Sequence, residues 1–194
     1  LKKPATFVVE ALPTFECFKI KRVVDLGCGT GRHSVYLAEN GFDVIGVDVS
    51  GSALRMANKW VRKKNLKNVS FMRGTMTHIP FGDSHFDAVV SVSVIHHAVK
   101  KDIVKTIAEV YRILKKNGLF LANLASVKDP RYGAGQRVES NTFMMLEAFE
   151  EKRFEELHHF FTKQEASKLL TRFAEAEVEL LKDKPNYWKI TALK

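Results

Sequence analysis

Short apolar runs alternate with segments of helical periodicity along the first 125 residues of the chain. The runs that we interpret as strands cover residues 23–26, 42–48, 69–72, 86–92 and 119–124. Helical spacing between them is clearest at Leu54, Ala57 and Val61 and again at Ile103, Ile107 and Val110. Strands that are apolar on both sides and alternate with helices are typical of a parallel sheet covered on both faces. The pattern therefore predicts an α/β fold.

Three helix boundaries carry local signals. Ser50 precedes a helical segment as an N-cap, and Asn117-Gly118 is expected to end the helix that contains Ile103. Thr162 and Glu165 have the spacing of a capping box, which predicts a further helix.

The region from residue 126 to residue 161 breaks the alternation. It contains Pro130 and clustered phenylalanines, and we expect an insertion with helical pieces that covers the site at the carboxyl ends of the strands. Residues 175–182 and 187–193 are expected to close the sheet as an antiparallel pair. The prediction is one domain over residues 1–194, with a seven-stranded, mostly parallel sheet, helices on both faces, an antiparallel last strand and an insertion after the fifth strand.

Composition and charge narrow the class of protein. The 194 residues are 45% hydrophobic, which suits one domain with a substantial core. The sequence has no apolar run of about 18 residues and no signal-peptide pattern, so we expect a cytoplasmic protein without a membrane partner. The net charge of +9 is dispersed along the chain, which favours a solvated basic surface and leaves nucleic acid as the alternative partner.

A glycine loop is the clearest chemical signal. Gly27, Gly29 and Gly31 lie between the first strand and a helix that begins near Arg32. Glycines permit positive φ and close approach of a ligand, and the first amides of a helix attract anionic groups. The loop therefore predicts a cofactor site.

The spacing of the loop narrows the choice of cofactor. A dinucleotide fingerprint has the pattern G-x-G-x-x-G, whereas this chain has G-x-G-x-G. Asp48 ends the second strand about 20 residues after the loop begins, where a carboxylate can accept hydrogen bonds from both ribose hydroxyls. A nucleoside without a pyrophosphate is the prediction.

Four further blocks follow the loop in order: Val44-Ile-Gly-Val-Asp-Val-Ser50, the segment 79–87, Ser93-Val-Ile-His-His97 and the segment 111–120. With the loop, they resemble the class I S-adenosylmethionine-dependent methyltransferases of the type 11/25 kind. The resemblance implies a Rossmann-like fold, S-adenosylmethionine as the cofactor, S-adenosylhomocysteine as its product, and no metal.

The resemblance assigns roles to the glycine loop. Asp25 would orient the methionine ammonium of the cofactor through water, and the backbone of Gly27, Cys28, Gly29 and Gly31 would pass under the methionine and ribose. A structural role remains open for two of these residues: Asp25 could cap the turn, and Cys28 could be a small residue that the loop tolerates.

The resemblance also assigns roles to later residues. Asp48 would bind the ribose, with Val49 against the adenine, unless Asp48 is simply a carboxylate stabilised by the dipole at a helix start. Ser91 would face the methionine end or pack within its strand. Thr75 stands where the family often has an acid that reads the adenine amino group, so backbone amides or the Met76 side chain would substitute for it.

Histidines raise the question of catalysis. His97, which follows His96 after the fourth strand, is the candidate general base for a methyl acceptor, with positioning or packing as the alternative. His158-His159 has a spacing too tight for a metal set and no evident cysteine or carboxylate partner, so we expect no zinc.

Three functions fit these observations. One is methyl transfer to a small-molecule acceptor, with the insertion forming the acceptor pocket. The second is methylation of RNA, because the chain is basic and the block 94–97 resembles enzymes that modify tRNA wobble uridines. The third is a non-catalytic, S-adenosylmethionine-binding partner subunit.

Overall fold

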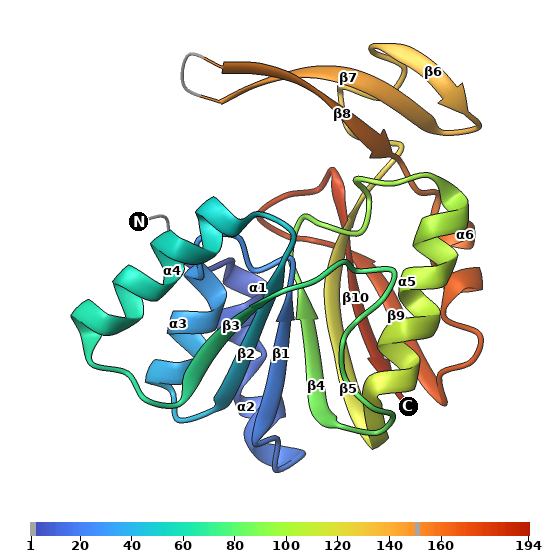
Figure 1. Ribbon diagram of the computed structural model, residues 1–194. Helices are drawn as coiled ribbons and strands as arrows, with labels where there is room; N and C mark the ends of the chain where they lie inside the picture. Colours follow the sequence, from blue (N-terminus) through green and yellow to red (C-terminus); the bar gives the residue numbers. More distant parts are fainter. Residues whose placement is uncertain (1–2, 150–151) are drawn as a thin grey trace.

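A seven-stranded sheet forms the centre of the computed structural model, which describes residues 3–149 and 152–194 (Figure 1). Its spatial order is β3-β2-β1-β4-β5-β10-β9, and β10 alone runs antiparallel to its neighbours. The strands are β1 (Arg22–Leu26), β2 (Asp43–Asp48), β3 (Val69–Arg73), β4 (Phe86–Ser91), β5 (Leu114–Ala125), β9 (Glu175–Leu180) and β10 (Tyr187–Leu193). The predicted α/β fold with an antiparallel last strand is confirmed.

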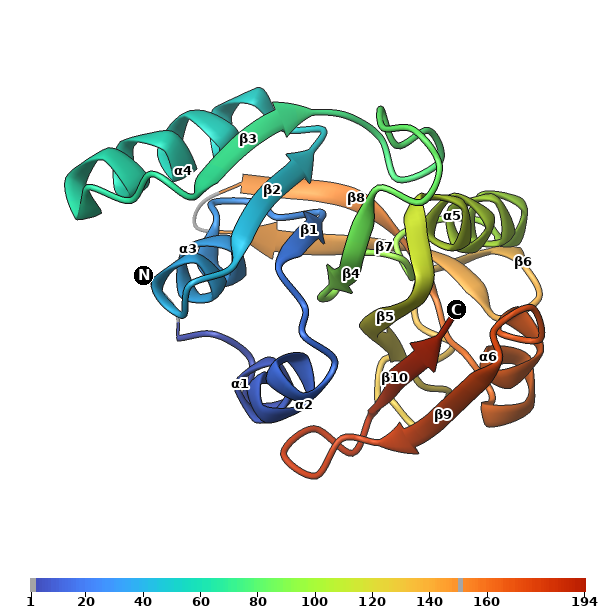
Figure 2. The same ribbon diagram turned by 90° about the horizontal axis from the view of Figure 1, so that it is seen from below.

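Helices cover both faces of this sheet (Figure 2). One face carries α1 (Thr6–Glu10), α2 (Leu12–Cys17), α3 (Arg32–Glu39) and α4 (Gly51–Lys64), and the other carries α5 (Lys100–Ile113) and α6 (Lys163–Leu169). Successive side chains of a strand point to opposite faces, so the neighbours Val23 and Val24 join different cores. Val23 packs with α1–α3, and Val24 packs with α5 and α6. In the part of the chain that the structure describes, no helix is long and apolar enough to cross a membrane.

A second sheet replaces the helical pieces that we expected between residues 126 and 161. It consists of β6 (Gln136–Glu139), β7 (Thr142–Phe149) and β8 (Lys152–His159), all antiparallel, and it lies over the carboxyl ends of the parallel strands (Figure 1). Phe143 and Met145 alternate along β7 and are buried against Phe160 and Ala125. The helical prediction was wrong because the alternation of buried and exposed residues along β7 is short, and a short apolar pattern does not distinguish a strand from a helix.

The predicted helix boundaries hold at two of the three positions. Ser50 Oγ accepts a hydrogen bond from the Ala53 amide (3.3 Å), and Thr162 Oγ1 accepts one from the Glu165 amide (3.1 Å). The prediction at Asn117-Gly118 was wrong, because α5 ends at Ile113 and β5 begins at once. Asn117 has φ 61° and lies in an irregular part of β5, where its amide donates to the Lys194 carbonyl (2.8 Å).

Turns join β3 to β4 over residues 74–85, and Arg112 of α5 holds them in place. Its guanidinium donates to the carbonyls of Ile79 (3.0 Å) and Phe81 (2.7 Å). Glu109 pairs with Arg112 (2.7 Å) and accepts from the Ile79 amide (2.8 Å). Because the same connection begins with residues 74–77, this clamp sets the position of a backbone segment at the carboxyl edge of the sheet.

Replacing Arg112 by lysine should loosen this connection. A lysine cannot reproduce the planar fork that reaches two carbonyls and a carboxylate together, so we expect Arg112→Lys to lower the free energy of unfolding by roughly 1 to 3 kcal/mol. Urea denaturation measures the change. Arg62→Lys, at an exposed position on α4, is the matched control and should have no measurable effect; equal losses in the two variants would contradict the clamp.

Candidate functional site

The glycine loop begins where β1 ends. The amides of Gly27 and Cys28 both donate to the Val47 carbonyl of β2 (2.7 and 3.1 Å). Gly27 has φ +72°, and a Cβ there would lie 2.2 Å from Val94 Cγ2, so the turn requires glycine. Gly29 has φ +53°, and among the described residues no atom would lie within 4 Å of its Cβ outside the adjacent chain. The loop is thus packed at its base and open at its tip.

The Asp48 carboxylate connects this loop to the end of β2 and to α4. Its Oδ2 accepts a hydrogen bond from the Gly29 amide (2.7 Å), and its Oδ1 accepts one from the Ser50 amide (2.8 Å). Each carboxylate oxygen can accept a second hydrogen bond. Asp48 is therefore held in one orientation and keeps acceptor capacity for a ligand's hydroxyl groups.

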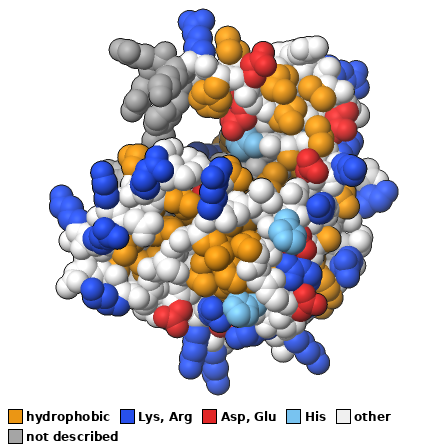
Figure 3. All heavy atoms as spheres, viewed as in Figure 1, with side chains coloured by type: hydrophobic (Ala, Val, Ile, Leu, Met, Phe, Trp, Pro, Cys, Tyr) orange, Lys and Arg blue, Asp and Glu red, His pale blue; other side chains and the backbone are white. Residues whose placement is uncertain are grey.

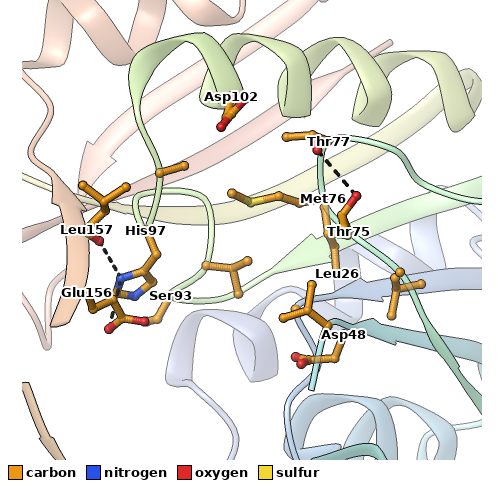
Figure 4. Close-up of a pocket in the computed structure, with 16 residues that line it drawn as sticks. Leu26, Asp48, Thr75, Met76, Thr77, Ser93, His97, Asp102, Glu156 and Leu157 are labelled. Carbon is orange, nitrogen blue, oxygen red and sulfur yellow. Dashed lines mark hydrogen bonds and ion pairs between the residues drawn. The ribbon is translucent and has the colours of Figure 1, made fainter. Parts of the chain in front are cut away.

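A cavity of about 550 Å³ lies at this edge of the sheet. Figure 4 shows Asp48 on one side of it and His97 with Glu156 on the other, and Met76 projects between them. Six of the residues predicted from the sequence line the cavity: Gly27, Asp48, Val49, Thr75, Met76 and His97. The structure thus brings the predicted ribose carboxylate and the predicted base to a common space.

The other predicted residues lie behind the lining. Ser91 is fully buried, and its Oγ donates to the Leu26 carbonyl (3.1 Å), as the strand-packing alternative predicts. Gly29 and Gly31 continue the loop into α3, with Gly31 in the left-handed conformation before the first helical residue. Burial raises the pKa of the Cys28 thiol, so this cysteine stays protonated and fits the role of a small loop residue.

Asp25 is also buried, with an exposed fraction of 1%. Ser34 Oγ donates a hydrogen bond to its Oδ2 (2.5 Å). Desolvation by burial nevertheless raises the pKa of Asp25 from 3.8 to about 6, against the lowering effect of Ser34. The carboxylate is therefore costly to ionise when no cation faces it.

Several lining residues were not predicted from the sequence. They are Leu26, Val47, Gly74, Thr77, Ser93, Val94, Ala98, Asp102, Glu156 and Leu157. Asp102 lies in the first turn of α5, so its position just after the 93–97 block was a usable signal. Glu156 and Leu157 come from β8, and no local pattern indicates that this strand reaches the cavity.

His97 has a defined orientation in the cavity wall. Its Nδ1 lies 3.1 Å from the Leu157 carbonyl and 3.4 Å from Glu156 Oε2 (Figure 4). A carbonyl oxygen can only accept, so Nδ1 carries the proton and Nε2 keeps its lone pair in the neutral ring. Burial lowers the pKa of His97 and outweighs the opposing effect of Glu156, so the ring is neutral at neutral pH.

The structure brings His158 to the His96-His97 pair. The ring centres of His96 and His97 are 4.3 Å apart, and those of His97 and His158 are 4.5 Å apart. The expectation that His158-His159 has no carboxylate partner was wrong. Glu147 Oε1 lies 3.0 Å from His158 Nε2, and Glu165 Oε1 lies 3.2 Å from His159 Nε2, because strand pairing and α6 bring these residues together.

Comparisons with known proteins agree with this geometry. Residues 23–118 match the family described as a methyltransferase domain. The matched residues and the fold are those of the class I S-adenosylmethionine-dependent methyltransferases. A solved structure of a methyltransferase of this kind from Methanosarcina mazei shares the fold, with a TM-score of 0.78 over 100% of this chain and 99% of that chain at 23% identity.

Relatives of known sequence are similar to part of this chain. YcgJ of Bacillus subtilis, an uncharacterized methyltransferase, is 34% identical over 57% of this chain and 43% of YcgJ. A fatty-acid O-methyltransferase of Mycolicibacterium smegmatis is 33% identical over 58% of this chain and 39% of that protein. The chain thus spans less than half the length of these two relatives.

The raised pKa of Asp25 predicts how the stability of the cofactor-free protein depends on pH. The folded state binds more protons than the unfolded state between about pH 4 and pH 6, so the Asp25 contribution to stability falls as pH rises through this window. Asp25→Asn, which can still accept from Ser34, should remove that fall. The difference between the free energies of unfolding of the variant and the parent should therefore increase from pH 4 to pH 6 and become constant near pH 7. The total increase should be at most about 3 kcal/mol. Urea denaturation at a series of pH values measures the difference, and a difference independent of pH would contradict the raised pKa.

Proposed function

We propose that this methyltransferase transfers the methyl group of S-adenosylmethionine to a small-molecule acceptor. The observation that carries the proposal is the cavity of about 550 Å³, which has Asp48 at one end and His97 with Glu156 at the other, under β8. Its size is within the range of sites for small molecules and cofactors.

The Asp48 end suits the nucleoside of the cofactor. Asp48 would accept hydrogen bonds from the ribose hydroxyls with the lone pairs that Gly29 and Ser50 leave free. Val49 is 58% exposed at the cavity wall, which provides an apolar surface for the adenine ring. Thr75 and Met76 line the same side and would border the adenine edge.

The glycine loop and the strand ends behind it would support the methionine end. The backbone of Gly27, Cys28, Gly29 and Gly31 would pass under the methionine and ribose. Asp25, which lies behind the lining, would act on the methionine ammonium through water, and the cation would offset the cost of ionising this carboxyl group. Ser91 would contribute indirectly, by holding the Leu26 carbonyl at the end of β1.

The chemistry requires little from the protein because the sulfonium already activates the methyl group. The cavity would align the acceptor atom with the methyl–sulfur bond and exclude water. His97 Nε2 would take the proton of a hydroxyl or amine acceptor as the new bond forms.

The charges around the cavity favour a small molecule over RNA. Among the described residues that line it, Asp48, Asp102 and Glu156 are acidic and none is lysine or arginine. The lysines and arginines on the face shown in Figure 3 are dispersed and form no continuous tract. A polyanion would gain little at such a site. The relative from M. smegmatis, named a fatty-acid O-methyltransferase, is an example of a small acceptor in the family.

Asp48→Asn tests the cofactor site. The asparagine side chain would direct its NH₂ group at the backbone N–H of Gly29 or of Ser50, where a donor meets a donor, and it would carry no charge. We therefore expect the affinity for S-adenosylmethionine to fall by about 10- to 100-fold. Asp43→Asn, at the exposed start of the same strand, is the control and should bind like the parent. Isothermal titration calorimetry measures both. Absence of binding by the parent would refute the proposal.

A labelling experiment tests the acceptor class. Radiolabelled S-adenosylmethionine is incubated with the protein and separate extracts of small metabolites and of RNA, and the label is expected in the metabolite fraction. His97→Gln should lower transfer by about 100-fold or more without weakening cofactor binding, because it removes a proton acceptor. His78→Gln, at an exposed position, is the control. Transfer of the label to RNA alone would support the RNA alternative instead.

A further inference from the structure

We propose that His96, His97 and His158 form a binding site for one transition-metal cation of the zinc type. The site lies between the segment that follows β4 and the strand β8. Each histidine offers one ring nitrogen, and these three atoms lie within 4.8 Å of one another. The sequence-based expectation of no metal considered each histidine pair by itself.

Backbone hydrogen bonds hold the three histidines together. The amide of His97 donates to the Val94 carbonyl (2.9 Å), which shapes the turn that carries the first two rings. The amide of His159 donates to the His96 carbonyl (2.7 Å), which joins β8 to that turn beside His158. The backbone therefore brings the three histidine positions together at one place in the fold.

Unpartnered nitrogens are the second, independent observation. His96 and His158 are 1% and 3% exposed. Among the described residues, no hydrogen bond reaches Nδ1 of His96 or Nδ1 of His158, whereas His158 Nε2 lies 3.0 Å from the Glu147 carboxylate. A buried polar atom without a partner costs roughly 1 to 3 kcal/mol. A cation that accepts these lone pairs would remove that cost.

The protonation of the rings suits metal binding. Histidine binds a metal through a ring nitrogen that carries no proton. His97 donates from Nδ1 to the Leu157 carbonyl, so Nε2 is the nitrogen of this ring that has a lone pair for a metal. Metal-binding histidines commonly make this kind of second hydrogen bond to a carbonyl or carboxylate.

Nearby charges also suit a divalent cation. Glu147 and Glu156 lie 3.0 and 3.6 Å from His158 Nε2. Arg131 contacts Glu147 (3.3 Å), but it is also paired with the buried Asp129 (3.0 Å). Three carboxylates and one guanidinium leave a formal charge of −2 around the cluster.

The donor set indicates the class of metal. Three imidazoles with a nearby carboxylate are typical of zinc and its neighbours among the divalent transition metals, whereas magnesium and calcium prefer oxygen. Nitrogens bound at 2.0–2.1 Å to a tetrahedral ion are about 3.4 Å apart, so the rings need to move inward by roughly an ångström.

The cation would also change the role of His97. With a metal on its Nε2, this ring is a ligand and no longer a free base, so metal-loaded and metal-free protein would differ in methyl transfer. Metal uptake itself is independent of the proposed function, because it is measured without cofactor or acceptor.

Zinc uptake by chelator-stripped protein tests the site. Isothermal titration calorimetry and elemental analysis should show one saturable Zn²⁺ per chain, and Zn²⁺ should raise the thermal midpoint of the parent. His96→Ala and His158→Phe should each weaken the affinity by at least about 100-fold, whereas His78→Gln should bind like the parent. His158→Phe fills the buried site with an apolar ring, so it should keep the metal-free fold.

Two results would overturn the proposal. One is a stripped parent protein that takes up no saturable Zn²⁺ and whose thermal midpoint does not change with the metal. The other is uptake that persists unchanged in a folded His158→Phe variant, which would show that the ion binds elsewhere on the surface.

Discussion

The position of the Asp48 carboxylate is the constraint on which the cofactor end of the site depends. Its two hydrogen bonds, to the amides of Gly29 and Ser50, join the loop after β1 to the start of α4 at the end of β2. The parallel pairing of Leu26 with Val47 brings these strand ends side by side, and Gly27 allows the loop to turn against Val94. Sheet register and loop conformation therefore depend on one another here, and the proposed recognition of the cofactor depends on both.

The cover of the site depends on backbone hydrogen bonds of a different kind. The amides of His159 and Phe161 donate to the carbonyls of His96 and Ala125 (both 2.7 Å), which attach β8 to the main domain. This attachment buries Nδ1 of His96 and Nδ1 of His158, which have no hydrogen-bond partner among the described residues, at a cost in free energy. A fold that tolerates such a cost at the edge of a cavity indicates a role for these rings beyond packing.

The charge of the chain and the charge of its cavity have opposite signs. The net charge of +9 resides on dispersed surface lysines and arginines, whereas Asp48, Asp102 and Glu156 line the cavity. Desolvation also raises the pKa of Asp25 behind the loop, so this part of the fold is most stable when its negative charge is balanced. A cationic sulfonium cofactor fits this environment better than a polyanion does.

The sequence by itself determined the main sheet, the glycine loop and Asp48, because burial periodicity, glycine spacing and a strand-end acid are local signals. It misassigned the segment of β6–β8, where the alternation at Phe143 and Met145 is brief. Only the tertiary structure placed Glu156 in the cavity wall and His158 beside His96, because antiparallel pairing and the attachment of β8 bring together residues that are far apart in the chain. Local patterns record which side of an element is buried, whereas the partner of each buried side is decided by packing.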